Sequence, residues 1–518
     1  MINNPAAAMR MLITYAICIP LAVLVGYLLT NPMDYGTLGF LGLVLALIIS
    51  PLFIKWHYPI MVFALASPIM VFFLKGNPPF GQVMVFLSLG IAVIERTLSG
   101  ERRFTSVPSL TRPLLFTLGV VLFTAELTGG IGFHAMGGDE GVIGGGKKYL
   151  AIFTGLATFY ALTSQVIPPE KRRFYMALFF LPPMLSAVSD LFPYLPAPLN
   201  YVNLLIPGSG YSMDSNALAD VGTKLKRFGG LAGLANALLT YMLVRYGLRN
   251  ILAGGHWWRT VLLMLLALLT LVGGFRSSMI NLIMVLTFLF FLEGLHRTRL
   301  MPIVGMGLVT LCVLLVPFAG KLPFSMQRSL TFLPLPNLDP QAVMDAEGST
   351  EWRLNMWSLL WPQVPNHLLL GKGFGLTKED FSMMGGGALA AGAERFDASS
   401  AGLAVSSDYH SGPLSTLIPF GAWGALAFFW LTLAGLRLLY RNYKYGEADL
   451  KSINCFLLAA AIAHWLSFFF IYGAFQNDVN YFAGIFGLSV AFNGGMRAPA
   501  PKPTVVQRFK PLPATQPA

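Results

Sequence analysis

Charged residues are scarce in this sequence, and their scarcity excludes a soluble protein. Only 11% of the 518 residues are charged, whereas a soluble domain carries about 25%. Hydrophobic residues make up 55% of the chain, and the mean hydropathy is +0.65. So few charges cannot solvate a globule of this size. Lipid must therefore solvate much of the surface, and the sequence predicts a membrane protein.

Cysteines and acidic metal-binding motifs are also few. The three cysteines, Cys18, Cys312 and Cys455, each lie inside an apolar run and form neither a CxxC pair nor a metal-ligand spacing. We interpret them as small hydrophobic side chains in helices. No Asp-x-Asp motif or carboxylate cluster occurs in the segments that we place outside the membrane, where Asp408 is the acid nearest to His410. No metal site is predicted.

The chain is basic, with 35 Lys and Arg residues against 23 Asp and Glu residues and a formal net charge of +12. These basic residues stand between apolar runs. That placement is typical of the loops that orient membrane proteins and not of a groove that follows nucleic-acid phosphates. We therefore expect contact with membrane lipid and no nucleic-acid partner.

Apolar runs long enough to cross a bilayer recur along the chain. A helix needs ~20 residues to cross a hydrocarbon core ~30 Å thick. We expect an all-α polytopic membrane protein with about 12–14 transmembrane helices. Arg10 precedes a run long enough to remain as the first span, so we expect no cleavable signal peptide. The predicted spans are residues 11–30, 36–54, 58–74, 80–95, 113–128, 149–167, 174–190, 229–246, 259–274, 278–295, 301–318, 413–436, 453–472 and 480–496.

If the N-terminus is cytoplasmic and the spans alternate, most lysines and arginines fall in inside loops. Both termini are then cytoplasmic, in the inner membrane of a bacterium. Three outside segments are too long to be turns, namely residues 128–148, 191–228 and 319–411. Loops of such length are usually functional or disordered. We expect the third to be a folded periplasmic subdomain with a helix over residues 351–361.

Four regions are predicted from these features. They are an N-terminal transmembrane bundle of about 11 spans over residues 1–318, the large periplasmic loop over 319–411, C-terminal transmembrane helices over 412–496, and a Pro-rich, disordered cytoplasmic tail over 497–518.

Arginines on the predicted outer face are candidate ligands for an anion. Arg276 lies at the junction of two spans, and Arg227 precedes a glycine-rich helix start whose free backbone N–H groups also favour anions. Arg353 lies on the predicted loop helix, and Arg328 is a weaker candidate. A guanidinium stays charged and offers a planar fork to phosphate oxygens. The structural alternatives are an arginine that extends to the interface, one that flanks a span, and a solvated helix face.

His410 lies where the large loop re-enters the membrane and is the candidate base, because histidine titrates near neutrality. The alternative is a structural hydrogen bond. The other histidines fall on the inside or, like His134 and His464, have no obvious partner. Residues 371–375 resemble a phosphate-binding loop only superficially, since the strand–turn–helix context is missing. Arginines that hold a diphosphate and a base that activates a hydroxyl would together form a lipid-diphosphate glycosyltransferase site.

The order of these motifs resembles the O-antigen ligase superfamily, which includes O-antigen ligases, O-antigen and exopolysaccharide polymerases, and pilin oligosaccharyltransferases. The resemblance covers about residues 227–424. It depends on Arg227-Phe-Gly-Gly-Leu with Asn236, on Phe275-Arg276-Ser-Ser, on Arg353 with Trp357 and the glycines of 371–375, and on His410 with Leu414, Gly421 and Gly424. Two positions depart from the pattern: Ser411 replaces an asparagine, and Pro419 replaces an acidic or aromatic residue.

The resemblance implies an inverting, metal-independent and cofactor-free transfer of glycan from undecaprenyl diphosphate. Arg227 and Arg276 would bind the diphosphate, Arg353 would assist, and His410 would remove the proton of the acceptor hydroxyl. The acceptor would be a glycan or the lipid A core, in lipopolysaccharide or exopolysaccharide biosynthesis, with polysaccharide export machinery as a further partner. Ligase, polymerase and protein glycosylation remain open.

Two other functions fit parts of the sequence. A transporter or flippase would suit the number of spans, but the chain has no internal repeat, few ionisable residues in mid-membrane and a very long external loop. A peptidoglycan glycosyltransferase of the shape-and-division class would need a catalytic acid in the large loop. Asp339, Asp345, Glu347 and Asp408 are the candidates for that acid.

Overall fold

The computed structural model describes residues 5–28, 35–74, 76–99, 104–128, 145–194, 196, 202–207, 228–375 and 409–499. These residues are predominantly helical, and they contain no strand beyond one bridge between Met70 and Pro79. The predicted all-α fold is therefore confirmed. The chain divides into two compact units, Met1–Ile60 and Met61–Ala518, which are described separately.

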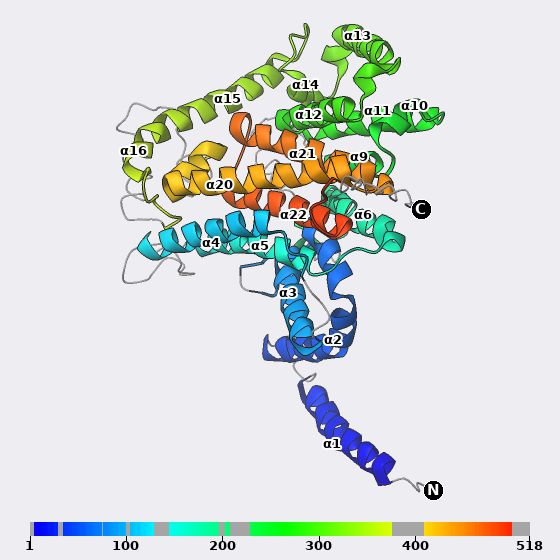
Figure 1. The fold of residues 1–518 in the computed structure, drawn as a ribbon, viewed down its shortest axis with the longest axis vertical. Coiled ribbons are helices and arrows are strands. Elements are labelled where there is room, and N and C mark those ends of the chain that lie inside the picture. The colour runs from blue at the N-terminus through cyan, green and yellow to red at the C-terminus, as the bar shows by residue number, and fades with distance from the viewer. Residues whose placement is uncertain are drawn as a thin grey trace, which may run out of the picture. The chain divides into compact units, whose positions relative to one another are not determined.

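The helices follow one another along the chain and are labelled in Figure 1 where there is room. They are α1 (Pro5–Leu28), α2 (Tyr35–Ala66), α3 (Phe80–Ser99), α4 (Pro108–Thr128), α5 (Gly146–Thr163), η1 (Pro169–Lys171), α6 (Arg172–Phe180), η2 (Pro182–Tyr194), α7 (Val202–Leu205), α9 (Gly229–Tyr246), α10 (Leu248–Ala253), α11 (Trp257–Thr270), η4 (Leu271–Gly273), α12 (Arg276–Leu292), η5 (Leu295–Arg297), α13 (Leu300–Phe318), η6 (Ala319–Lys321), α14 (Phe324–Leu330), α15 (Pro340–Leu360), η7 (Trp361–Gln363), α16 (Val364–His367), α20 (Gly412–Tyr445), η9 (Ala448–Leu450), α21 (Lys451–Phe470) and α22 (Phe475–Asn493).

The predicted spans 36–54 and 58–74 are not two helices, because α2 runs without interruption from Tyr35 to Ala66. Only three residues separate the two predicted runs, and they are too few to reverse the chain. Pro51 and Pro59 lie inside the helix and do not end it. The predicted placement of the N-terminus depended on two crossings here, so it loses its basis.

Seven helical segments in the described part of the chain are long and apolar enough to cross a membrane. They are Ile48–Ala66, Phe80–Leu98, Pro108–Thr128, Pro169–Phe192, Leu300–Lys321, Gly412–Tyr445 and Ala448–Phe470. Shorter apolar helices include Trp257–Gly273 and Arg276–Leu292. The chain is therefore a multi-pass membrane protein, although fewer segments meet this criterion than the 12–14 that we predicted.

Three helices of 18 or 19 residues, α5, α9 and α22, fall outside these seven because polar and small residues interrupt their apolar surfaces. Most residues of α5 and α22 are buried in the second unit. Nearly every residue of α22 is buried. Gly155 of α5 lets α22 approach closely, since a Cβ there would lie 2.9 Å from the Cα of Asn480. Small residues commonly allow this close packing between membrane helices.

One end of the second unit is held by ion pairs. Arg172 at the start of α6 pairs with Glu447 at 2.7 Å and also with Asp449. Arg497 pairs with Glu447 at 2.7 Å, and its backbone N–H donates to Oδ1 of Asn442. Arg497, the first residue of the predicted tail, therefore makes specific contacts. Residues 500–518 of that tail lie outside the described chain. Arg172 and Arg497 were predicted to lie on the inside.

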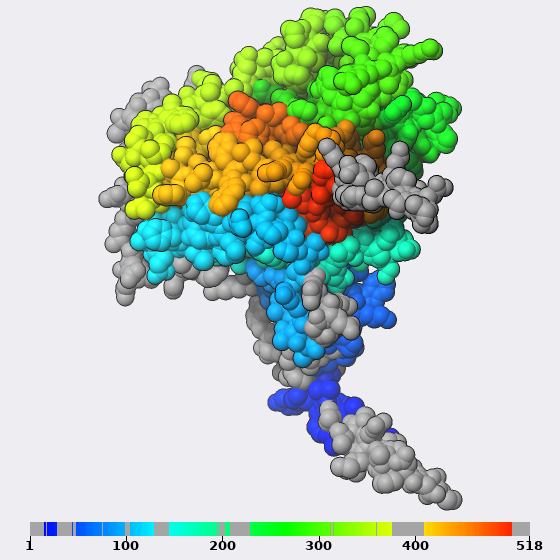
Figure 2. All heavy atoms as spheres, viewed as in Figure 1, coloured from blue at the N-terminus to red at the C-terminus, as the bar shows by residue number. Residues whose placement is uncertain are grey.

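The opposite end carries the large loop. Figure 1 shows α15 running from α14 to α16, where the chain meets α20. In Figure 2, side chains of the yellow-green segment that includes α16 lie directly against gold α20. The predicted loop helix at 351–361 exists but begins earlier, at Pro340. Residues 376–408 of the loop lie outside the described chain.

Candidate functional site

Helix α15 is the element that gathers the candidate residues, and its start explains its length. Asp339 is the N-cap, and its Oδ1 accepts from the backbone N–H of Gln341 at 2.9 Å. Pro340 follows as the first helical residue, where its fixed φ suits a helix and its missing N–H costs nothing. This Asp-Pro pair is a helix-start signal that our sequence interpretation missed.

Arg276 is the first residue of α12 and reaches across to α15. The turn before it contains Gly274 in the left-handed region (φ 72°), which is accessible to glycine without steric cost. Arg276 Nη2 donates to the carbonyl of Ala346 at 2.6 Å and to Oγ1 of Thr350 at 2.9 Å. The guanidinium is therefore fixed at one turn of α15 and does not extend freely to the membrane interface.

Arg328 of α14 reinforces the same junction. Its Nη1 donates to the carbonyl of Gly274 at 2.8 Å, and its Nη2 donates to Oγ of Ser349 at 3.0 Å. Arg328 thus ties the turn before Arg276 to α15. This contact pattern indicates a residue that positions Arg276.

Arg353 lies on α15 one turn beyond Ser349 and Thr350, so it shares their side of the helix. It is half-buried, and its positive charge acts unfavourably on that of Arg276. Within the described residues, no carboxylate lies within ion-pair distance of either arginine. Two like charges in a partly buried site gain from a bound anion, so this pair forms an electropositive centre.

His410 is held between aromatic rings at the other side of the same turn. Its ring centroid lies 5.2 Å from that of Trp352 and 5.0 Å from that of Tyr472, both in edge-to-face geometry. Its φ is 48°, a left-handed value that is uncommon for a residue other than glycine. Such strain is often found at functional sites.

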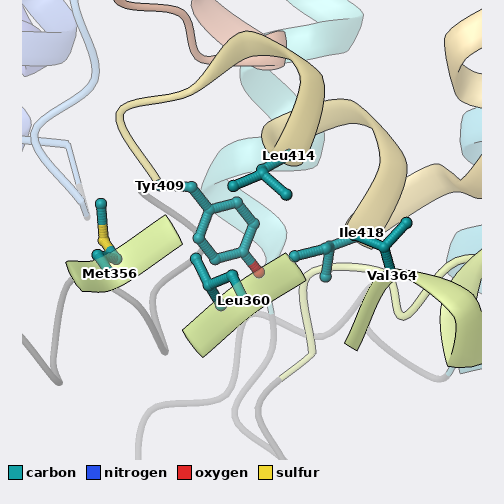
Figure 3. Close-up of a cluster of buried hydrophobic side chains, with 6 residues drawn as sticks. All are labelled: Met356, Leu360, Val364, Tyr409, Leu414 and Ile418. Carbon is teal, nitrogen blue, oxygen red and sulfur yellow. The ribbon is translucent and has the colours of Figure 1, made fainter. Parts of the chain in front are cut away.

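A buried hydrophobic cluster fixes α15 beside His410 (Figure 3). Met356, Leu360 and Val364 contribute from the loop helices, and Tyr409, Leu414 and Ile418 contribute from the start of α20 and the residue before His410. Trp352 and Trp357 pack against this cluster, and Trp357 Nε1 donates to the carbonyl of Tyr409 at 3.0 Å. Trp352 and Trp357 therefore anchor the loop.

Three of the four predicted site residues are linked to residues 346–353 of α15. Trp352 contacts His410, and its neighbour Arg353 acts electrostatically on Arg276. Arg227, the fourth, lies outside the described residues. Arg276, Arg353 and His410 are therefore linked through α15 and remain the candidate site residues.

The helix start that follows Arg227 differs from our prediction of free N–H groups. Asp190 of η2 accepts from the backbone N–H of Leu231 at 2.7 Å, so a carboxylate of the protein already occupies part of that helix terminus. The glycines serve packing, because a Cβ at Gly230 would lie 2.2 Å from the carbonyl oxygen of Ser186. The glycine-rich segment thus lets α9 contact η2.

The glycines of residues 371–375 serve a break in α20. Helix α20 departs from helical geometry at Gly421 (φ 61°), and the loop supplies hydrogen bonds that the break removes. The N–H groups of Lys372 and Gly373 donate to the carbonyls of Ile418 and Pro419, while Ala422 donates to the carbonyl of Leu368. These N–H groups bind protein carbonyls, so they do not form a phosphate-binding loop.

A partly buried histidine–aspartate pair was missed in the sequence. His464 of α21 lies with Nε2 2.5 Å from Oδ1 of Asp478, and the other carboxylate oxygen accepts from the N–H of Ala474. The His464 ring also stacks on Tyr481 at 3.8 Å. The partners come together through the turn between α21 and α22. The only sequence signal was an acid in the first turn of a helix, where it favours capping.

Comparison with protein families identifies the segment that carries this site. Residues 260–429 match the model of a family described as O-antigen ligase. This segment of the chain is similar to the O-antigen ligase family. The predicted family resemblance is thus confirmed, and the matched segment includes Arg276, Arg353 and His410. Members of the O-antigen ligase family are glycosyltransferase-like enzymes. A comparison with curated proteins found no significant match.

Proposed function

We propose that this O-antigen ligase-type protein transfers or polymerises glycan from undecaprenyl diphosphate on the periplasmic face of a bacterial inner membrane. Arg276 and Arg353, with Arg227, bind the diphosphate, and His410 is the general base. The observation that carries the proposal is that α15 binds Arg276, carries Arg353 beside it and places Trp352 against His410.

Charge requirements support these roles. When the glycan leaves undecaprenyl diphosphate, negative charge develops on the leaving diphosphate. Fixed donors that are already aimed at such charge stabilise the transition state without reorganisation. Arg276 is oriented by the carbonyl of Ala346 and the hydroxyl of Thr350, so its remaining N–H groups have a defined direction. No group of three His, Cys, Asp or Glu side chains suited to a metal occurs in the described part of the chain.

The proposed reaction is a single displacement that inverts the anomeric carbon. The acceptor hydroxyl oxygen attacks that carbon from the face opposite the diphosphate, and the bond between the carbon and the diphosphate oxygen breaks. His410 takes the hydroxyl proton, and undecaprenyl diphosphate leaves with the bonding electron pair. The acceptor is a sugar hydroxyl of a growing glycan or of the lipid A core, in lipopolysaccharide or exopolysaccharide synthesis.

The charges at the two ends of the second unit support the proposed sidedness. The site residues lie at the end that carries α15, and the Arg172 and Arg497 ion pairs lie at the other end. Basic residues favour the cytoplasmic side. We therefore assign the α15 end to the periplasm and the C-terminus to the cytoplasm.

The decisive test compares Arg276→Ala and His410→Ala with Arg299→Ala, an exposed arginine in the η5–α13 connection. Each variant replaces the wild type in its native host, and its abundance in the membrane is measured beside the glycan product. We expect both site variants to lose transfer while lipid-linked glycan accumulates, and Arg299→Ala to behave as the wild type. Intact transfer in either site variant at normal abundance would contradict the proposal.

A further inference from the structure

A second polar feature lies inside the helix bundle, apart from the arginine and histidine side chains. It is a cavity of about 720 Å³ bounded mainly by α9, α12 and α22, with contributions from η2 and α21. This volume falls within the roughly 300–1,000 Å³ of ordinary ligand sites. Phe275 and Ser278 line it, and Arg276 stands between them in sequence. The cavity is thus lined by residues on both sides of Arg276 in the sequence.

Each of the three main helices presents a single face to the cavity. On α9 that face is Gly229, Ala232, Gly233, Asn236 and Thr240, which recur at helical spacing. Its first residues are small and therefore leave space. On α12 the face is Ser278, Asn281, Leu282 and Val285, and on α22 it is Asn477, Asn480, Tyr481 and Gly484. Every face carries at least one asparagine.

Asparagines are costly at such positions in a membrane protein unless their amides form hydrogen bonds. Asn236, Asn477 and Asn480 are exposed, although they belong to helices of the bundle interior. Oδ1 of Asn281 is shielded and has no hydrogen-bond partner among the described residues. Buried polar atoms are nearly always paired in native proteins, so Oδ1 of Asn281 indicates a polar occupant, and the exposed amides of the other three asparagines are accessible to it.

The remaining lining defines the chemistry of that occupant. Among the described residues, the side chains that line the cavity include no Lys, Arg, His, Asp or Glu and so supply no charge for a phosphate or a cation. Four asparagines with several hydroxyls also make it a poor site for a lipid tail. Amide groups both donate and accept, as sugar hydroxyls require. Phe179, Phe275 and Tyr481 add aromatic surface for the apolar faces of a sugar ring.

We propose that this cavity binds a neutral sugar of the lipid-linked glycan and so selects the repeat unit. The inference depends on the proposed function, because it places the sugar next to the diphosphate that Arg276 holds. Asn236, Asn281 and Asn480 supply its hydrogen bonds, one from each main helix. Tyr481 is positioned by its stack on His464, which in turn pairs with Asp478.

The test measures binding of two lipids by purified protein in nanodiscs. One probe is the lipid-linked glycan that accumulates in the deletion strain, and the other is undecaprenyl diphosphate without sugar. Asn236→Leu, Asn281→Leu and Asn480→Leu are compared with Asn250→Leu, an exposed asparagine on α10. We expect each cavity variant to bind the glycan lipid about tenfold more weakly, the effect of one lost hydrogen bond. Binding of the sugar-free lipid should change less than twofold.

Alanine variants at the same positions repeat the test without added bulk, and thermal unfolding verifies that each variant is folded. Unchanged binding of the glycan lipid, or equal weakening of both lipids, would overturn the cavity inference and leave the proposed function intact. A deletion strain that accumulates no lipid-linked glycan would overturn the proposed function, and the cavity inference would fall with it.

Discussion

His410 combines a strained backbone with a side chain that is enclosed by aromatic rings. Asparagine tolerates the left-handed region better than most residues but cannot act as a base near neutral pH. We predict that His410→Asn keeps the thermal stability of the wild type to within about 1 kcal/mol, while glycan transfer falls by about 10²–10⁴-fold. The β-branched His410→Val should lose both stability and transfer, because it cannot adopt φ 48° without strain.

These two variants separate the base from a structural histidine. Thermal unfolding of purified protein and glycan transfer in membranes are the measurements. If His410→Asn retained full transfer, the histidine would serve only the backbone turn before α20.

At the residue scale, the sequence predicted types of residue better than their contacts. Arg276, Arg353 and His410 could be chosen because charge is rare in this chain and these residues share one predicted side. The pairing of His464 with Asp478 could not be predicted, since it depends on the geometry of the turn after α21. The role of Arg328 also depends on tertiary structure, because its partners are a backbone carbonyl and a serine on another helix.

At the scale of a helix, substitutions of Asp339 distinguish the proposed function of the protein from the peptidoglycan-type alternative. As the N-cap of α15, it should contribute about 1 kcal/mol to stability and little to chemistry. We predict that Asp339→Ala lowers the free energy of unfolding by about that amount with transfer reduced less than about threefold. Asp339→Ser, which retains a capping oxygen, should restore stability.

The alternative of a peptidoglycan-type glycosyltransferase makes the opposite prediction, because it requires an acid in the loop as a catalyst. Loss of transfer in both Asp339→Ala and Asp339→Ser, with unchanged stability, would favour that alternative.

The break in α20 allows a second test at the scale of an element. Gly421 has φ 61°, and a Cβ there would lie 2.6 Å from the carbonyl oxygen of Leu368. We predict that Gly421→Ala destabilises the protein by about 1–3 kcal/mol and reduces transfer, because residues 367–373 can no longer dock on the break. Gly305→Ala in α13 is the matched control, since nothing lies within 4 Å of its Cβ position. Equal stability of the two variants would contradict this account.

The resemblance to the family singled out Gly421 and the 371–375 glycines without giving a reason for them. The reason is visible only in the fold, where two distant segments exchange backbone hydrogen bonds.

Some helix boundaries also could not be predicted from the sequence pattern. Apolar runs predicted the lipid-facing helices well, but they gave two spans where α2 is one helix. A polar break between two apolar runs was interpreted as a turn, but hydropathy alone does not show whether the backbone turns at such a break.

For the whole molecule, several residues that the alternation of loops assigned to the same side lie at the same end of the second unit. The ends of α6, α20 and α21 that carry Arg172, Glu447 and Asp449 meet, as do the α12, α15 and α20 ends near Arg276 and His410. This grouping follows from helix length alone, because each crossing carries the chain to the opposite end. Which end faces the periplasm depends on charge, and it can be measured.

Cysteine labelling tests that orientation. In a background without Cys18, Cys312 and Cys455, single cysteines are placed at Asn355 on α15 and at Ala448 in η9, both exposed positions at opposite ends. A maleimide that cannot cross the inner membrane is added to cells whose outer membrane is permeable. We predict that Asn355→Cys reacts at once and that Ala448→Cys reacts only after the inner membrane is opened, because basic loops are retained in the cytoplasm. The reverse pattern would place Arg276 and His410 in the cytoplasm and would exclude transfer on the periplasmic face.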